Sequence, residues 1–183
     1  MKNYLNRGNY GKMKKIILDI ETCGLESIND RIICIGIQDI NEKIINSFSG
    51  EDEKIILIEF WKAIENCDEI ITYCGNGFDI PFLVRRSLIN NIKVSDNFRD
   101  KRIKFTDLKL VVDSFFMCYQ HHHGKLHDWA NVLGIKIQTE NGSKMKEYYE
   151  KKEWDKIIDH CEEDILITKQ LFERCLECNL VKK

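Results

Sequence analysis

The stretch Ile16-Ile17-Leu18-Asp19-Ile20-Glu21 is the part of the sequence that most clearly indicates the fold. Its apolar, β-branched run is typical of a strand buried at the centre of a sheet. Side chains alternate between the faces of a strand, so Asp19 and Glu21 are expected on one face at its C-terminal end. Two carboxylates in an apolar environment repel each other, and a cation between them removes that cost. The alternative is that the strand ends at Ile20, Glu21 begins a solvated turn and Asp19 caps nearby backbone.

The pattern on the C-terminal side of this stretch alternates strands and helices. Apolar and β-branched runs predict further strands over 31–39, 42–48 and 69–74. Residues 101–109 fit a strand or a loop. A capping box, Ser49-Gly50-Glu51-Asp52, is expected to open a helix that runs to about residue 66. Further helices are expected over 81–90, 109–118 and 126–133.

A final helix is the clearest predicted element. Its apolar stripe recurs mostly at spacings of three and four, as expected for a helix packed on a core. Three strands, a helix, a strand and then mostly helix predict an α/β fold, a mixed β-sheet flanked by α-helices, rather than a repeated βαβ array. The stripe consists of Trp154, Ile157, Ile158, Cys161, Ile165, Thr168, Phe172 and Cys175.

Composition fits one soluble globular domain, because the chain has 183 residues, of which 43% are hydrophobic and 32% charged. We expect residues 1–12 to be a flexible N-terminal extension and residues 13–183 to form the domain. The polar, basic start is unlike a secretory signal, and no run approaches the about 18–20 apolar residues of a membrane span. We therefore expect a cytoplasmic location and no membrane partner. The net charge of −2 predicts no strong general affinity for nucleic acid, although it is compatible with a local basic groove.

Several other polar features have structural interpretations. The eight cysteines are mostly scattered singly through apolar segments and are expected to be reduced, and Cys175 and Cys178 lack the second pair of a zinc site. We interpret His121-His122-His123 as a polar loop. A loose basic region is either a solvated face or an entry that binds phosphates. It consists of Arg85, Arg86, Arg99, Lys101, Arg102 and Lys104.

Two more acids stand beside apolar residues. Asp79 follows the 69–74 strand, where it either caps the next helix or belongs to a site. Asp164 borders the apolar stripe of the final helix, and His160 lies one turn earlier on the same side. Together with the acids of the first strand they predict an oxygen-rich site that suits Mg²⁺ or Mn²⁺. Two such ions about 3.5–4 Å apart clamp the attacking and leaving oxygens of a phosphodiester displacement.

Four motifs carry a resemblance to a known family. Ile17-Leu18-Asp19-Ile20-Glu21-Thr22 resembles the first motif of the DEDD superfamily of 3′–5′ exonucleases, which have an RNase H-like fold. Tyr73-Cys74-Gly75-Asn76-Gly77-Phe78-Asp79 is similar to the second motif, and His160-Cys161-Glu162-Glu163-Asp164 resembles the third. The segment 126–135 is similar to one that commonly lies between the second and third motifs. The order and spacing of these motifs match those of the family over about residues 13–178.

The resemblance implies roles for individual residues. The metal ligands for two divalent cations, Mg²⁺ or Mn²⁺, would be Asp19, Glu21, Asp79 and Asp164. Glu21 would also touch the terminal 3′ hydroxyl. Thr22 and Leu25 would lie against the last nucleotide, and Asn76 and Phe82 would line the groove for the penultimate one.

The position of the implied general base departs from the family pattern. The tyrosine subclass has its base four positions before the last aspartate, and the histidine subclass has it five positions before. His160 stands four positions before Asp164. The resemblance therefore implies His160 as the catalytic base, with the spacing of the tyrosine subclass.

The expected activity is that of a metal-dependent 3′–5′ exonuclease acting on a single-stranded DNA or RNA 3′ end and releasing nucleoside monophosphates, with no obligate protein partner. The alternative is a nucleic-acid-binding domain that has kept this fold and lost turnover. The presence of all four acids favours the enzyme. A purely structural protein would leave Asp19 and Asp164 without an explanation, and the sequence does not distinguish DNA from RNA.

Overall fold

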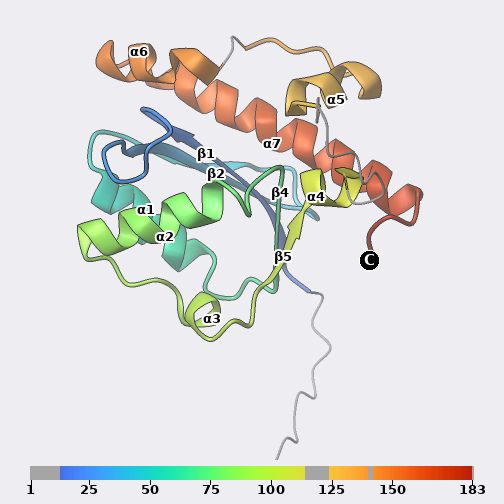
Figure 1. Ribbon diagram of the computed structural model, residues 1–183, viewed down its shortest axis with the longest axis horizontal. Helices are drawn as coiled ribbons and strands as arrows, with labels where there is room; N and C mark the ends of the chain where they lie inside the picture. Colours follow the sequence, from blue (N-terminus) through green and yellow to red (C-terminus); the bar gives the residue numbers. More distant parts are fainter. Residues whose placement is uncertain (1–12, 114–123, 140–141, 183) are drawn as a thin grey trace, which may run out of the picture.

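The computed structural model describes residues 13–113, 124–139 and 142–182, and within them the chain forms a five-stranded mixed sheet of order β3-β2-β1-β4-β5 (Figure 1). Strands β1 (Lys15–Thr22), β2 (Ile32–Asp39) and β3 (Asn46–Ser49) are antiparallel neighbours. Strands β4 (Glu69–Thr72) and β5 (Lys104–Asp107) continue the sheet in parallel with β1. The predicted α/β fold, a mixed β-sheet flanked by α-helices, is confirmed.

Strand β1 lies at the centre of the sheet. The sheet separates two hydrophobic clusters, one on each face. Ile16, Leu18 and Ile20 pack with helices α1 (Glu53–Ala63) and α2 (Asp79–Asn90) on one face. Ile17 packs on the other face, beneath helix α7 (Trp154–Glu177). Because side chains alternate along a strand, Asp19 and Glu21 point to the α7 face as Ile17 does.

Helix α7 contacts β1, β2 and β3 and crosses one face of the sheet (Figure 1). The predicted apolar stripe is confirmed, since Ile157, Cys161 and Ile165 are fully buried. Gly36 on β2 lets the helix come this close. A Cβ atom at Gly36 would lie 2.4 Å from Ile165 Cδ1 and 2.7 Å from Cys161 Sγ.

Shorter helices lie before and after β5 in the chain or pack against α7. Helix α3 (Asp96–Arg99) precedes β5, and α4 (Leu108–Asp113) follows it. Helices α5 (Leu126–Leu133) and α6 (Met145–Glu150) pack against α7, with a 3₁₀ turn over Gly142–Lys144 before α6. In the described part of the chain, no helix is long and apolar enough to span a membrane. The cysteines described there are all free.

Some predicted boundaries are wrong for local reasons. Helix α1 is capped by Asp52, whose side chain accepts the N–H of Lys54, rather than by Ser49, which belongs to β3. The predicted strand 42–48 begins later, because Gln38 Nε2 donates to the carbonyl oxygens of residues 42 and 43 and holds them in the turn. The predicted helix 109–118 begins at Leu108, and residues 114–118 lie outside the described part. The 101–109 segment contains β5.

The domain boundary at Met13 stays a prediction, since residues 1–12 lie outside the described part. Deleting Met1–Lys12 is expected to leave the melting temperature and any catalytic rate nearly unchanged, because this segment has too little apolar content to contribute to a core. Differential scanning calorimetry of the full and shortened chains measures this. A large loss of stability would place the boundary before Met13.

A buried ion pair joins α1 and α2. Arg86 Nη2 lies 2.7 Å from Glu53 Oε2, and Arg86 Nε donates to Glu53 Oε1 at 2.9 Å. The same carboxylate accepts the N–H of Ile32 at 2.8 Å and the side-chain amide of Asn90 at 2.9 Å. Glu53 thus ties both helices to the beginning of β2.

We expect Glu53→Gln to destabilise the protein by about 3–5 kcal/mol at neutral pH, because it leaves the Arg86 charge buried without a counter-ion. Burial raises the pKa of Glu53, but the hydrogen bonds from Arg86, Ile32 and Asn90 outweigh it and hold the pKa below its usual value of 4.5. The stabilisation is therefore present above about pH 4.5 and is lost as the pH falls through the lower pKa of the folded state. Urea unfolding of wild type and Glu53→Gln at neutral and acid pH should show that their difference in unfolding free energy shrinks in acid.

Glu51→Gln is the matched control, because Glu51 pairs with Lys152 at an exposed site. It should change the unfolding free energy little. If the difference in unfolding free energy between wild type and Glu53→Gln persisted unchanged in acid, the stabilisation would not come from the charge of Glu53.

Candidate active site

The candidate site begins at the C-terminal end of β1, on the face beneath α7. Strand β1 continues through Thr22, so Glu21 lies within the strand and the alternative in which the strand ends at Ile20 is wrong. Glu21 is 7% exposed and Asp19 is partly buried. Ligand atoms of Asp19, Glu21 and Cys161 lie within 4.8 Å of one another. A hydrogen bond with Cys34, burial and the nearby acids raise the pKa of the Cys161 thiol far above its usual value, so this thiol keeps its proton.

Asp79 reaches the same region from the start of α2. Phe78 is the N-cap residue and Asp79 is the first residue of the helix, so the expected capping position is occupied by its neighbour. Asp79 is buried, and its burial together with the charge of Glu21 raises the pKa of Asp79 to about 7. A carboxyl group with so high a pKa is costly to ionise, which is typical of functional sites.

Asp107 at the end of β5 holds the loop that precedes Asp79. Its carboxylate accepts the backbone N–H of Cys74 at 2.9 Å and that of Asn76 at 3.0 Å. It also accepts the N–H of Lys109 at 3.0 Å, at the beginning of α4. Sequence analysis missed this residue because it lies in the ambiguous 101–109 segment, and its partners are remote in sequence.

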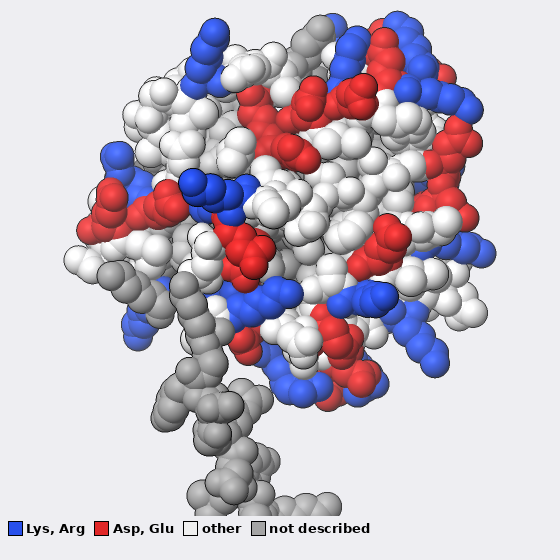
Figure 2. Space-filling view, turned by 180° about the vertical axis from the view of Figure 1, so that it is seen from behind, with Lys and Arg blue, Asp and Glu red and all other residues white. Residues whose placement is uncertain are grey.

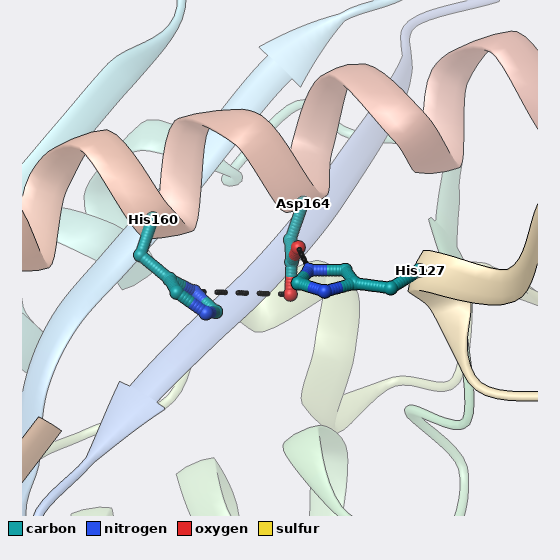
Figure 3. Close-up of side chains that lie close together, drawn as sticks. All are labelled: His127, His160 and Asp164. Atoms are coloured by element: carbon teal, nitrogen blue, oxygen red, sulfur yellow. Dashed lines mark hydrogen bonds and ion pairs between the residues drawn. The ribbon is translucent and has the colours of Figure 1, made fainter. Parts of the chain in front are cut away.

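Helix α7 supplies Asp164 and His160, one turn apart. His160 Nδ1 lies 2.7 Å from Glu21 Oε1. It also lies 3.9 Å from Asp164 Oδ2 (Figure 3). His160 is only 4% exposed. Burial of the ring lowers the pKa of His160, but the hydrogen bond to Glu21 and the charges of Glu21, Asp164 and Glu163 together raise it above its usual value.

His127 on α5 is a further member of the site that sequence analysis missed. Its Nε2 lies 3.1 Å from Asp164 Oδ1, and its ring centroid lies 5.9 Å from that of His160 (Figure 3). The hydrogen bond to Asp164 raises the pKa of His127. The available signal was its position three residues before Ala130, which is fully buried on the same helix face.

The acids interact strongly enough to perturb one another. Burial, followed by the charges of Asp164, Glu21 and Asp79, raises the pKa of Asp19 well above its usual value. Burial also raises the pKa of Glu21, although the hydrogen bond with His160 opposes the rise. Carboxylates in this arrangement disfavour their own ionised state, and a divalent cation would relieve the repulsion. Their oxygen-rich donor set fits Mg²⁺ or Mn²⁺.

The predicted substrate-binding residues lie in different environments. Leu25 is 82% exposed, and Asn76 is exposed on the loop before α2. Thr22 Oγ1 donates to the carbonyl oxygen of Gly24 at 2.6 Å. Phe82 is 2% exposed and packs in the core with its ring centroid 5.3 Å from that of Phe78. The nucleotide contacts of these four residues stay predictions.

Much of the predicted basic region is committed to ion pairs. Besides Arg86, Lys104 Nζ lies 2.6 Å from Glu69 Oε1, and Arg99 and Arg102 both pair with Asp100 at 2.9 Å. Figure 2 shows positive and negative side chains interleaved over the face that it views. The exposed pairs of Arg99 and Arg102 with Asp100 favour the interpretation of that part as a solvated face, whereas Arg86 belongs to the protein interior. The His121-His122-His123 triplet lies outside the described residues.

Comparison with known proteins agrees with this architecture. Residues 16–176 match the family model of the RNase H superfamily, and the chain belongs to that superfamily. An uncharacterized protein of Methanocaldococcus jannaschii is 31% identical over 182 residues, which cover 93% of this chain and all of that protein.

A solved structure shows the same fold. The family B DNA polymerase from the hyperthermophilic archaeon Pyrobaculum calidifontis matches with a TM-score of 0.74 and 19% identity over 93% of this chain. The chain spans 25% of the polymerase's length. The predicted RNase H-like fold is confirmed, whereas the DEDD assignment and the roles of the site residues stay predictions.

Proposed function

We propose that this protein is a 3′–5′ exonuclease that hydrolyses phosphodiester bonds at single-stranded nucleic-acid 3′ ends. The observation that supports it is the convergence of acids from three separate elements. Asp19 and Glu21 come from β1, Asp79 from α2 and Asp164 from α7. The effect of Asp164, Glu21 and Asp79 on the pKa of Asp19 reflects this closeness. Buried acids that raise one another's pKa have little structural use without a cation or a reacting group.

The site residues have distinct roles in this proposal. Asp19, Glu21, Asp79 and Asp164 would hold two divalent cations, Mg²⁺ or Mn²⁺, which when bound supply electrostatic stabilisation of the charge that develops on the phosphate. Glu21 would also orient the terminal 3′ hydroxyl. His160 would accept or relay a proton at Nδ1, the ring nitrogen that faces Glu21 and Asp164. Released nucleotides would be nucleoside monophosphates, and the proposed location is cytoplasmic.

Digestion of 5′-labelled DNA and RNA oligomers of equal sequence tests the proposal. With Mg²⁺ or Mn²⁺ we expect a ladder that shortens from the 3′ end, and no ladder with EDTA. The two oligomers also report the sugar preference. A matched oligomer with a blocked 3′ end is the control and should stay intact.

Two results would contradict the proposal. Internal cleavage of the blocked oligomer would indicate an endonuclease. Binding of the oligomers without cleavage under any divalent cation would favour the alternative, a nucleic-acid-binding domain without turnover.

A further inference from the structure

Helix α5 brings His127 against one oxygen of the Asp164 carboxylate. His127 Nε2 lies 3.1 Å from Asp164 Oδ1 (Figure 3). The other oxygen, Oδ2, lies 3.9 Å from His160 Nδ1, which is too long for a hydrogen bond. Within the described part of the chain, His127 is therefore the residue whose side chain hydrogen-bonds the Asp164 carboxylate.

We propose that His127 is a positioning residue for Asp164, which donates a hydrogen bond from Nε2 to Oδ1 and so keeps Oδ2 directed toward His160. Without this bond the carboxylate is free to rotate about its Cβ–Cγ bond, a torsion with a broad energy profile. His127 would not itself bind a cation. The inference deepens the proposed function and rests on it, because it takes Asp164 as one of the four acids that would hold divalent cations.

The polarity of this hydrogen bond follows from the chemistry of its two partners. An ionised carboxylate only accepts hydrogen bonds, so Nε2 of His127 carries the proton. A ring nitrogen in that state has no lone pair to offer a metal ion. Residues that lie outside a ligand set and hold a ligating carboxylate by a hydrogen bond are usual in metal sites, where they orient the ligand.

Helix α5 is anchored to the sheet, so His127 projects from a fixed base. Tyr73, which follows β4, donates its O–H to the carbonyl oxygen of Gly124 and accepts the indole N–H of Trp129 at 3.2 Å. Ala130, three residues after His127, is fully buried. Residues on both sides of His127 are therefore attached to the rest of the domain, as is expected for groups that support a preorganised site.

A pair of substitutions at His127 tests the proposal, and the side chain is 31% exposed, so they do not open the core. His127→Phe keeps a planar ring but has no donor, whereas His127→Gln keeps a donor in its side-chain amide. Calorimetric titration of the full, metal-free chain with Mn²⁺ and with Mg²⁺ compares them with wild type. The phenylalanine variant should bind both ions about 10–100-fold more weakly, the usual effect of removing a residue that orients a ligand. Glutamine should recover most of the lost affinity.

The two ions distinguish positioning from ligation. Because carboxylate oxygens bind either ion, the loss of a positioning residue should weaken Mn²⁺ and Mg²⁺ binding by similar factors. A loss confined to Mn²⁺ would make His127 a ligand, since imidazole nitrogen suits transition metals better than Mg²⁺, and would overturn the proposal. Unchanged affinity of the phenylalanine variant for both ions, or no recovery with glutamine, would also overturn it.

Asn131→Ala is the matched control, because Asn131 is exposed one turn further along α5. It should bind both ions as wild type does. If this variant lost as much affinity as His127→Phe, binding would depend on α5 in general rather than on the hydrogen bond from Nε2, and the proposal would be overturned.

Nitrogen NMR of the wild-type protein gives a readout that needs no variant. In the metal-free protein, Nε2 of His127 should carry a proton, whether or not Nδ1 carries one as well. A proton on Nδ1 alone, with Nε2 bare, would overturn the proposal.

Failure of this inference and failure of the proposed function give different results. Hydrolysis of oligomers together with metal binding that does not depend on the donor at position 127 overturns this inference alone. Metal binding that depends on that donor, in a protein that cleaves no oligomer, overturns the exonuclease proposal and leaves the positioning of Asp164 standing.

Discussion

Asp19→Asn is expected to lower oligomer hydrolysis at least about 100-fold and to raise the melting temperature of the cation-free protein. The rate falls because the substitution removes a central charge of the site. A loss of this size is typical of removing one key electrostatic contact in an active site. The gain in stability follows from the raised pKa of Asp19, caused by burial and by Asp164, Glu21 and Asp79. An acid whose pKa is raised on folding destabilises the folded state once it is ionised.

The sign of the pH dependence makes this prediction specific. Wild type loses stability as the pH rises above the pKa of Asp19 in the unfolded chain, whereas the asparagine does not titrate. The variant should therefore be more stable near neutral pH and equal in acid, as measured by thermal unfolding in EDTA. Asp155→Asn, at an exposed aspartate in the first turn of α7, is the control and should retain wild-type cleavage. Wild-type cleavage by Asp19→Asn itself would refute the proposed metal site.

His160→Ala is expected to lose about 10²–10⁴-fold in rate, the usual contribution of general acid–base catalysis. His160→Tyr should retain appreciable activity, because the spacing to Asp164 is that of the tyrosine subclass which the sequence resembles. The ring is buried and bonded to Glu21, so alanine also removes packing and one hydrogen bond. Rates must therefore be expressed per folded molecule, with the folded fraction taken from circular dichroism.

The pH–rate profile separates a catalytic role from a positioning role. If His160 is the base, it acts in its neutral form, so the wild-type rate rises with pH through its pKa and then levels off. His160→Ala should lose that rise. If His160 only holds Glu21 in place, the alanine variant keeps the shape of the profile at a lower rate. An unchanged rate per folded molecule would remove His160 from the mechanism.

The elements with regular periodicity could be predicted from the sequence. The alternation along β1 placed Asp19 and Glu21 on one face, and the apolar stripe of α7 placed His160 and Asp164 toward the sheet. Both depend on local geometry that a single stretch of sequence carries.

Residues whose roles depend on distant partners could not be predicted in this way. His127 meets Asp164 across 37 positions, and Asp107 binds backbone N–H groups more than 30 positions away. Arg86, counted with the basic region, is paired with Glu53 inside the protein. Nothing in the local pattern distinguishes such residues from solvated polar side chains.

The position of α7 at the end of the described chain has a consequence for protein synthesis. Asp19 and Glu21 lie in the first strand, whereas His160 and Asp164 lie on the last helix, more than a hundred residues later. A ribosome-bound chain that has formed only the sheet and α1 and α2 still lacks two of the side chains proposed for catalysis. Any hydrolytic activity would therefore arise only after α7 has been synthesised and has settled over Gly36.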